Sequence, residues 1–302
     1  MMKRATLLIL WLLLGSVSFG ALASPAVPSY LPGGSSSQAA VLYFRYQGTP
    51  YLGREKRTLL FDPASSYEKA LVQALLDGPS AVYAHLVPLF PEGTRVLGTR
   101  AQGNILFVTF NENIMNPYTN ENNLADPLYR EGEGRLRRTL AMSALSCTIT
   151  ENTSYAYVQV LVEGAAVRND SLRLPQSYYL LESDILPPPL SRDEGSIMKP
   201  HDAVELMCQK WALKDLTGMG EFITANGDSS EAWGEIPLLT GYTLSPGTIS
   251  HDGTSAMVLL SAAMQLNDGT ILERGGWPLR LQAAEGIWLI QAESLLPLWG
   301  AP

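Results

Sequence analysis

Few residues in this chain are equipped for catalysis or metal binding, and they lie far apart. The 302 residues include three histidines, His85, His201 and His251, and none has a second histidine or cysteine at a helical or hairpin spacing. Metal sites need convergent ligands, so we expect these histidines to cap elements or to face solvent. The GxSxG, HExxH and CxxC motifs and the phosphate-binding GxxxxGK loop are absent. The sequence therefore predicts no catalytic, cofactor-binding or metal-binding residue and no cofactor.

Acidic and tryptophan side chains in the last third of the chain form an alternative candidate site. A hydrolase would use two carboxylates, and a small-ligand sensor would use tryptophans as the walls of a pocket. No spacing brings two of these acids together, and tryptophans at such spacings are more often part of a core. The candidates are Asp215, Glu221, Glu235 and Glu273 among the acids and Trp211, Trp233, Trp277 and Trp288 among the tryptophans.

The segment from 111 to 135 carries polar side chains that could hold an ion. Its carboxylates are few, and no glycine occupies the sharp-turn position of a calcium loop. The run Glu131-Gly132-Glu133-Gly134 has glycines suited to an anion nest, yet its glutamates would repel a phosphate. We expect a solvated insertion followed by an acidic lead-in that favours a helix N-terminus. The oxygen-bearing residues of the insertion are Asn111, Asn113, Asn116, Asn120, Asn122 and Asp126.

Cys147 and Cys208 are the only candidates for redox chemistry. Each lies on the apolar side of a predicted helix, and the two helices belong to different predicted domains. Because free cysteines are commonly buried, we expect two buried thiols rather than a disulfide, although export would permit one.

Composition limits the class of protein without naming a reaction. Hydrophobic residues make up 46% of the chain and charged residues 17%, so packed cores are expected, and the length favours two domains. The chain carries 21 basic and 29 acidic residues, a formal charge of −8. That balance disfavours non-specific binding to nucleic acid or to anionic lipid, which requires clustered lysines and arginines.

The first 40 residues predict export. Lys3 and Arg4 precede an apolar run from Ala5, and Ala21-Leu22-Ala23 places small residues where a signal peptidase cleaves. We predict a signal peptide over residues 1–23, and an uncleaved membrane anchor is the alternative. Residues 24–40, rich in Pro, Gly and Ser, predict a flexible tether.

Residues 41–181 predict a domain of the α+β class. Ser65 or Ser66 can cap a helix over 67–76, and Gly78 can end it. Apolar alternation and turn residues predict the other elements. They are strands at 41–44 and 58–61, a hairpin of strands at 95–100 and 105–110, a helix over 136–149 and a closing strand at 157–162. This order predicts a sandwich with the helices on one face of a sheet.

Four segments in this region carry a family resemblance. The helix end at 70–79, the hairpin entry at 91–97, the return strand at 105–111 and the final strand at 158–164 resemble corresponding segments of the GerMN domain family, a module of sporulation and spore germination. They occur in the family's order and cover about two fifths of the chain. The chain departs from the family pattern between Asn111 and Arg135. The resemblance implies a non-catalytic, extracytoplasmic binding module, and it carries over no catalytic residue, because the shared positions are core and turn positions.

The remaining chain predicts a second, smaller domain. Residues 182–199 are rich in proline and polar residues and predict an exposed linker. A helix is expected from Pro200 to near Gly220, followed by four strands at 239–249, 255–266, 271–283 and 287–292 in an antiparallel meander. This helix-plus-meander domain, residues 200–299, resembles the cone of nuclear-transport-factor-2-like and cystatin-like domains in architecture alone, which does not establish a function.

These observations together predict an exported, non-catalytic binding module of the bacterial cell envelope, and the resemblance implies a role in sporulation or germination. Its expected partner is an envelope or spore-associated protein, a cell-wall component or a second copy of the chain. No nucleic acid is expected, and membrane contact is expected only if residues 1–23 stay attached. A small-ligand sensor or hydrolase that uses a pocket in the C-terminal domain is the alternative.

Overall fold

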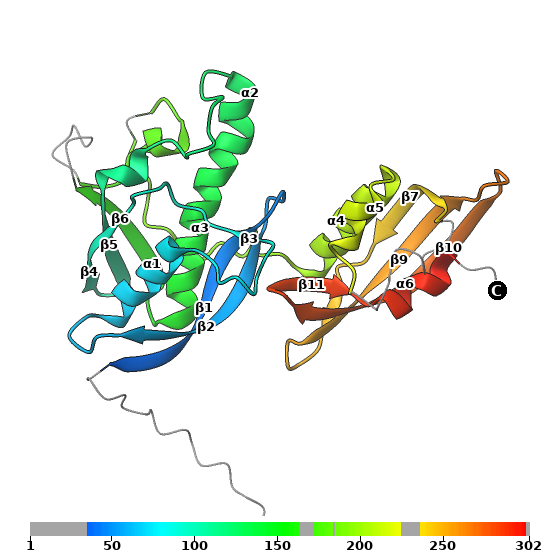
Figure 1. Ribbon diagram of the computed structural model, residues 1–302, viewed down its shortest axis with the longest axis horizontal. Helices are drawn as coiled ribbons and strands as arrows, with labels where there is room; N and C mark the ends of the chain where they lie inside the picture. Colours follow the sequence, from blue (N-terminus) through cyan, green and yellow to red (C-terminus); the bar gives the residue numbers. More distant parts are fainter. Residues whose placement is uncertain (1–34, 164–171, 184, 225–235, 300–302) are drawn as a thin grey trace, which may run out of the picture.

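The computed structural model describes residues 35–163, 172–183, 185–224 and 236–299, which form two domains side by side (Figure 1). The predicted signal peptide lies outside the described residues. The domains combine helices with sheets whose strand pairs are mostly antiparallel, which confirms the α+β class. In the described part of the chain, no helix is both long enough and apolar enough to cross a membrane.

The N-terminal domain contains two small sheets and a central helix. One sheet has the order β2-β1-β3 and the other has the order β4-β5-β6, in which β5 and β6 are parallel. The predicted helices and strands are present, with ends shifted by a few residues. The elements are β1 (Ser36–Tyr46), β2 (Leu52–Phe61), α1 (Tyr67–Asp77), β3 (Leu86–Val87), β4 (Val96–Gln102), β5 (Ile105–Asn111), α2 (Pro127–Tyr129), α3 (Arg135–Asn152) and β6 (Tyr157–Glu163).

Local sequence signals set the ends of α1. The Ser66 hydroxyl accepts a hydrogen bond from the Lys69 backbone N–H at 3.2 Å, as an N-cap does. At the other end Gly78 has a φ of 86°, and its N–H donates to the Leu75 carbonyl. Both caps were predicted from the residue types.

Strand β1 begins earlier than predicted. Ser36–Ala40 pair with Arg57–Phe61, so the last residues of the predicted tether are part of the sheet. Backbone pairing with a long partner strand extends the ladder even where the side chains are polar, because the hydrogen bonds are made by the main chain.

Helix α3 is buried on all sides from Leu140 to Ile149, rather than on one face. One side packs on β1, and the other is covered by residues 190–198, part of the predicted exposed linker. Leu190 pairs with Val158, and Leu52 pairs with Ile197, so this segment belongs to the N-terminal domain. The linker prediction was wrong because a polar, proline-rich segment can still satisfy its backbone at a sheet edge.

Polar side chains of α3 and β1 hold this covering segment. The Ser143 hydroxyl donates to the Asp193 carboxylate at 2.7 Å, and the Tyr43 hydroxyl accepts a hydrogen bond from Arg192 at 2.9 Å. Burial opposes ionisation of Asp193, but hydrogen bonds from Ser196 and Ser143 hold the pKa of its carboxyl below the ordinary value.

The insertion between β5 and α3 is partly packed, which corrects the prediction of a solvated loop. Glu121 accepts two hydrogen bonds from the Arg138 guanidinium, at 2.6 and 2.7 Å, and both side chains are almost fully buried. The Tyr118 hydroxyl donates to the Leu89 carbonyl at 2.9 Å. A buried carboxylate with a bidentate partner therefore anchors the loop, while Asn120, Asn122 and Asp126 are exposed.

The C-terminal domain is the predicted helix and antiparallel meander, with strand order β11-β10-β9-β7. The expected single helix is divided, because Lys214 has a φ of 58° and the Asp215 carboxylate caps a second helix through the Gly218 N–H. A short C-terminal helix was not predicted. The elements are α4 (Pro200–Ala212), α5 (Leu216–Gly220), β7 (Leu238–Leu244), β8 (Thr248–Ile249), β9 (Ser255–Gln265), β10 (Ile271–Ala284), β11 (Ile287–Ile290) and α6 (Ala292–Trp299).

The two domains contact each other through the β1–β2 hairpin and the β10–β11 turn. The Arg54 backbone N–H donates to the Gly286 carbonyl at 2.7 Å. The Tyr46 ring packs on Phe222, with centroids 5.7 Å apart, and its hydroxyl donates to the Glu221 carbonyl. The apolar cores of both domains join in one cluster of buried residues.

Candidate functional site

The three histidines lie apart, each with a structural partner or in solvent. His85 packs against the Tyr46 ring, with centroids 5.8 Å apart. His201, at the start of α4, places Nδ1 2.9 Å from the Ser245 carbonyl, and His251 is exposed in the β8–β9 turn. Among the residues the structure describes, no group of three His, Cys, Asp or Glu side chains is placed to hold a metal ion.

The acids and tryptophans of the alternative site do not gather around one cavity. Trp211 is buried against Trp299 and donates to the Pro237 carbonyl at 2.8 Å. Trp277 donates to the Ser294 carbonyl of α6. Asp215 caps α5, and Glu273 borders a shallow depression on β7, β9 and β10. Trp233 and Glu235 lie outside the described residues.

Both cysteines are buried free thiols, as predicted. Burial raises the pKa of the Cys147 thiol and, more strongly, that of Cys208. Raised pKa values disfavour the nucleophilic thiolate, so neither residue is activated for chemistry.

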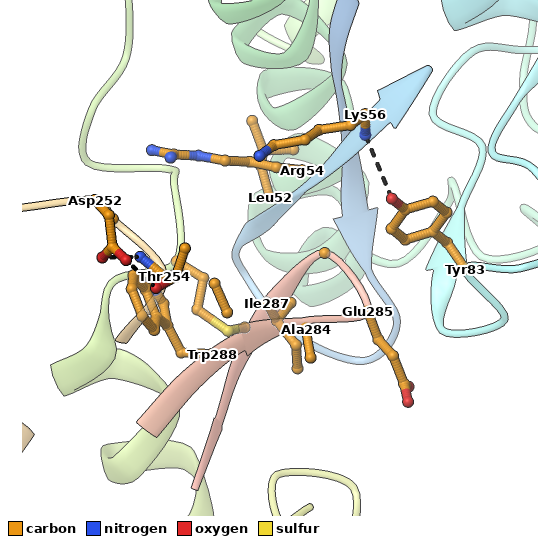
Figure 2. A pocket seen from close by; sticks show the side chains of 14 residues that line it. Leu52, Arg54, Lys56, Tyr83, Asp252, Thr254, Ala284, Glu285, Ile287 and Trp288 are labelled. Carbon is orange, nitrogen blue, oxygen red and sulfur yellow. Dashed lines mark hydrogen bonds between the residues drawn. The ribbon is translucent and has the colours of Figure 1, made fainter. Parts of the chain in front are cut away.

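A cavity lies between the two domains (Figure 2). This interdomain cleft has a volume of about 260 Å³. Strand β2 and the loop before β3 form one side, and the β8–β9 and β10–β11 turns form the other. The lining side chains include Leu52, Arg54, Lys56, Tyr83, Asp252 and Trp288.

Arg54 and Lys56 are the cations of the interdomain cleft. They are two residues apart on β2, so their side chains share one face of the strand, and both are exposed. In Figure 2 they extend in the same direction, above the β8–β9 turn. No acidic side chain of the described residues forms an ion pair with either one, although the Arg54 guanidinium lies 5.8 Å from the centroid of the Tyr43 ring.

Two acids, Asp252 and Glu285, also line the cleft, but neither forms an ion pair with Arg54 or Lys56. Asp252 accepts hydrogen bonds from the Ser250 hydroxyl, and from the Thr254 hydroxyl and backbone N–H, at 2.6, 2.7 and 3.1 Å. These bonds lower the pKa of the Asp252 carboxyl to about 2 and keep it within its own turn. Glu285 points away from Arg54 and Lys56 (Figure 2).

The cleft has the chemistry of a binding surface. It combines two available cations with an apolar floor that includes Leu52 and Trp288. Its described lining contains no histidine, cysteine or serine, and its one threonine hydroxyl, that of Thr254, donates to Asp252. Such a lining can hold an anionic group.

Sequence reasoning missed Arg54 and Lys56, because the strand at 58–61 was predicted too short to include them. The signal was the alternation Arg54-Glu55-Lys56-Arg57. Glu55 is almost fully buried and pairs with Arg57 at 2.6 Å on one face of β2, which leaves the other two charges on the exposed face.

The N-terminal domain is similar to a known protein family. Residues 41–168 match the family model Germane, described as sporulation and spore germination. These residues are thus similar to that sporulation and germination family. The match coincides with the described α+β domain and confirms the resemblance of the four sequence segments. Among curated proteins, no relative of similar sequence was found.

Two solved structures show similarity to the chain. The first is the tandem GerMN domains of the sporulation protein GerM from Bacillus subtilis, with 14% identity and a TM-score of 0.34, covering 56% of this chain and 49% of that one. The second is a putative lipoprotein from Clostridium perfringens, with 18% identity and a TM-score of 0.27, covering 50% of this chain and 86% of that one. The chain thus spans about half the length of the GerM structure.

Proposed function

We propose that this chain is an exported, non-catalytic binding protein of a bacterial cell envelope that acts in sporulation or spore germination. Its GerMN domain would dock to an envelope or spore-associated protein, to a cell-wall component or to a second copy. The family match over residues 41–168 carries the proposal. It is supported by the interdomain cleft, whose described lining suits binding rather than bond cleavage.

Substitutions can distinguish a binding protein from an enzyme, because the two depend on different residues. Interfaces depend on packed surfaces, whereas catalysis depends on a few polar groups. Leu75 lies on the buried face of α1 and is 1% exposed. Leu75→Ala should therefore cost about 2–5 kcal/mol of stability and weaken partner capture. Capture should survive alanine at all five polar candidates together, namely His85, His201, His251, Glu221 and Glu273.

The measurement is affinity capture of a reproducible partner from the native host, with the full chain as bait. Circular dichroism confirms that each variant is folded. Loss of biological activity in one folded alanine variant of the five polar candidates would contradict the non-catalytic proposal. Intact mass of the protein from the host tests export, because cleavage after Ala23 leaves Ser24 as the first residue.

A further inference from the structure

Strand β2 forms an edge of its sheet that is covered at one end and open at the other. The N–H groups of Leu52, Arg54 and Lys56 all donate to groups outside the β1–β2 ladder, and because backbone direction alternates in an antiparallel pair, the backbone groups of the even-numbered residues of β2 point outward. The outward N–H of Leu52 donates to the Ser196 carbonyl, and that of Arg54 donates to the Gly286 carbonyl, both at 2.7 Å.

The cover ends at Lys56. Its N–H donates to the Tyr83 hydroxyl at 3.4 Å, the longest of the three bonds. Beyond it, the outward backbone groups of Thr58 and Leu60 have no hydrogen-bond partner among the described residues. Leu60 is also 63% exposed. We call the segment Lys56–Leu60 the open edge of β2. Unprotected edges of this kind pair readily with an added strand.

The charges beside the open edge select the partner. Arg54 and Lys56 lie on the exposed face without an ion pair in the described structure, in a chain whose formal charge is −8. In a strand added to β2, a side chain opposite Lys56 lies about 5 Å from it between Cβ atoms, and Arg54 is the diagonal neighbour. An acidic residue there would meet both cations at the entrance of the interdomain cleft.

We propose that the open edge of β2 binds an extended acidic segment of a partner protein as an added strand, with its acidic residues held by Arg54 and Lys56. The favoured segment has an acid opposite Lys56, a polar residue opposite Thr58 and an apolar residue opposite Leu60. This inference rests on the proposed binding function and names the surface and the chemistry of the partner.

The probe is a fluorescein-labelled peptide with the sequence Val-Ser-Thr-Ser-Glu-Asp, amidated at its end. Fluorescence anisotropy with the full chain should show saturable binding that weakens as NaCl is raised from about 50 to about 500 mM, because screening reduces the charge contacts. The matched peptide ending in Gln-Asn should bind about tenfold more weakly. Equal affinity of the two peptides would overturn the role of Arg54 and Lys56.

The matched protein variants change the same charge at two different edges. Arg54→Gln with Lys56→Gln should weaken binding of the acidic peptide about tenfold and leave the neutral peptide unaffected. Arg95→Gln with Arg100→Gln is the control, because it removes two exposed cations at strand β4, which is also an edge strand. Equal losses in the two double variants would show a non-specific charge effect and overturn the assigned site.

Modified peptides and one substitution at the edge test strand addition. Peptides N-methylated at alternate amides should separate into one set that binds and one that does not, since only one set of amides faces β2. Thr58→Pro, which removes an outward N–H at the edge, should abolish binding of the unmethylated peptide. Equal binding of both methylated sets would overturn the added strand.

The remaining outcomes separate this inference from the function on which it rests. A concentration-dependent dimer that Thr58→Pro dissolves in sedimentation velocity would assign the edge to a second copy and overturn the acidic-segment proposal. Partner capture that persists in the Arg54 and Lys56 double variant would also overturn the inference, while the proposed binding function would stand. Leu75→Ala tests the proposed binding function separately, because loss of capture in this variant supports that function whether or not the open edge of β2 is involved.

Discussion

The contact between the two domains depends on a glycine that admits no side chain. Gly286, in the β10–β11 turn, has a φ of 84°, and a Cβ placed there would lie 2.8 Å from the Arg54 carbonyl oxygen and 3.3 Å from side-chain atoms of Leu86 and Tyr83. We therefore predict that Gly286→Ala separates the two domains at the β1–β2 hairpin.

Gly269→Ala supplies the matched control. Gly269, in the β9–β10 turn, has a φ of 85°, and a Cβ there would meet no atom within 4 Å. The left-handed backbone costs an L-residue about 1–2 kcal/mol in either variant. The difference between the variants therefore isolates the contact with the N-terminal domain.

The magnitude follows from two effects at Gly286. Forcing a methyl group into a packed contact costs about 1–3 kcal/mol. Weakening the 2.7 Å hydrogen bond from the Arg54 N–H adds about 0.5–1.5 kcal/mol. Gly286→Ala should thus lose about 1.5–4.5 kcal/mol more stability than Gly269→Ala, which corresponds to a further decrease in Tm of about 3–18 °C.

Differential scanning calorimetry measures both variants, and tryptophan fluorescence in urea follows the same change, since Trp288 lies two residues from the altered position. A single transition in the wild type that divides into two in Gly286→Ala would show that the glycine couples the domains. Equal Tm decreases in the two variants would refute the reasoning, because the turn would then contribute only its own backbone strain.

Three further predictions concern the N-terminal domain and the thiols. Glu121→Gln should cost about 3–5 kcal/mol, because it leaves the Arg138 charge buried without its partner, and urea unfolding measures the loss. Burial opposes ionisation of Glu121, yet hydrogen bonds from Arg138 and the Tyr118 N–H hold the pKa of its carboxyl below 4.5 in the folded protein. The ionised Glu121 therefore contributes its full stabilisation above about pH 4.5, and this stabilisation is lost as the pH falls through the lower pKa of the folded state. Wild type should therefore lose more stability than Glu121→Gln below about pH 4.5, and parallel pH profiles would contradict the assignment. Limited proteolysis of the native chain should not cut within 190–198, because these residues pair with β2 and β6, and rapid cleavage there would restore the view of an exposed linker. Cys147 and Cys208 should react with a thiol reagent only in denaturant, since both are 0% exposed, and stoichiometric labelling of the folded protein would refute their burial.

Local chemistry determined much of this protein before any tertiary contact was considered. The cap at Ser66, the termination at Gly78 and the turns at Asp252-Gly253 and Asp268-Gly269 act over a few residues, so their residue types predict them directly. The alternation of apolar residues then gave the strands and helices of both domains, and four segments of that pattern sufficed to indicate the GerMN family.

Only the tertiary structure decided which polar segments are buried and which charges stay available. Residues 190–198 read as a linker because nothing local shows that α3 leaves a side uncovered, and Glu121 is buried only because Arg138, 17 residues later, lies opposite it. Arg54 and Lys56 have no distinguishing motif. Their position at a cleft depends on the Gly286 turn, more than 200 residues away, and such long-range contacts arise from packing that no local pattern encodes.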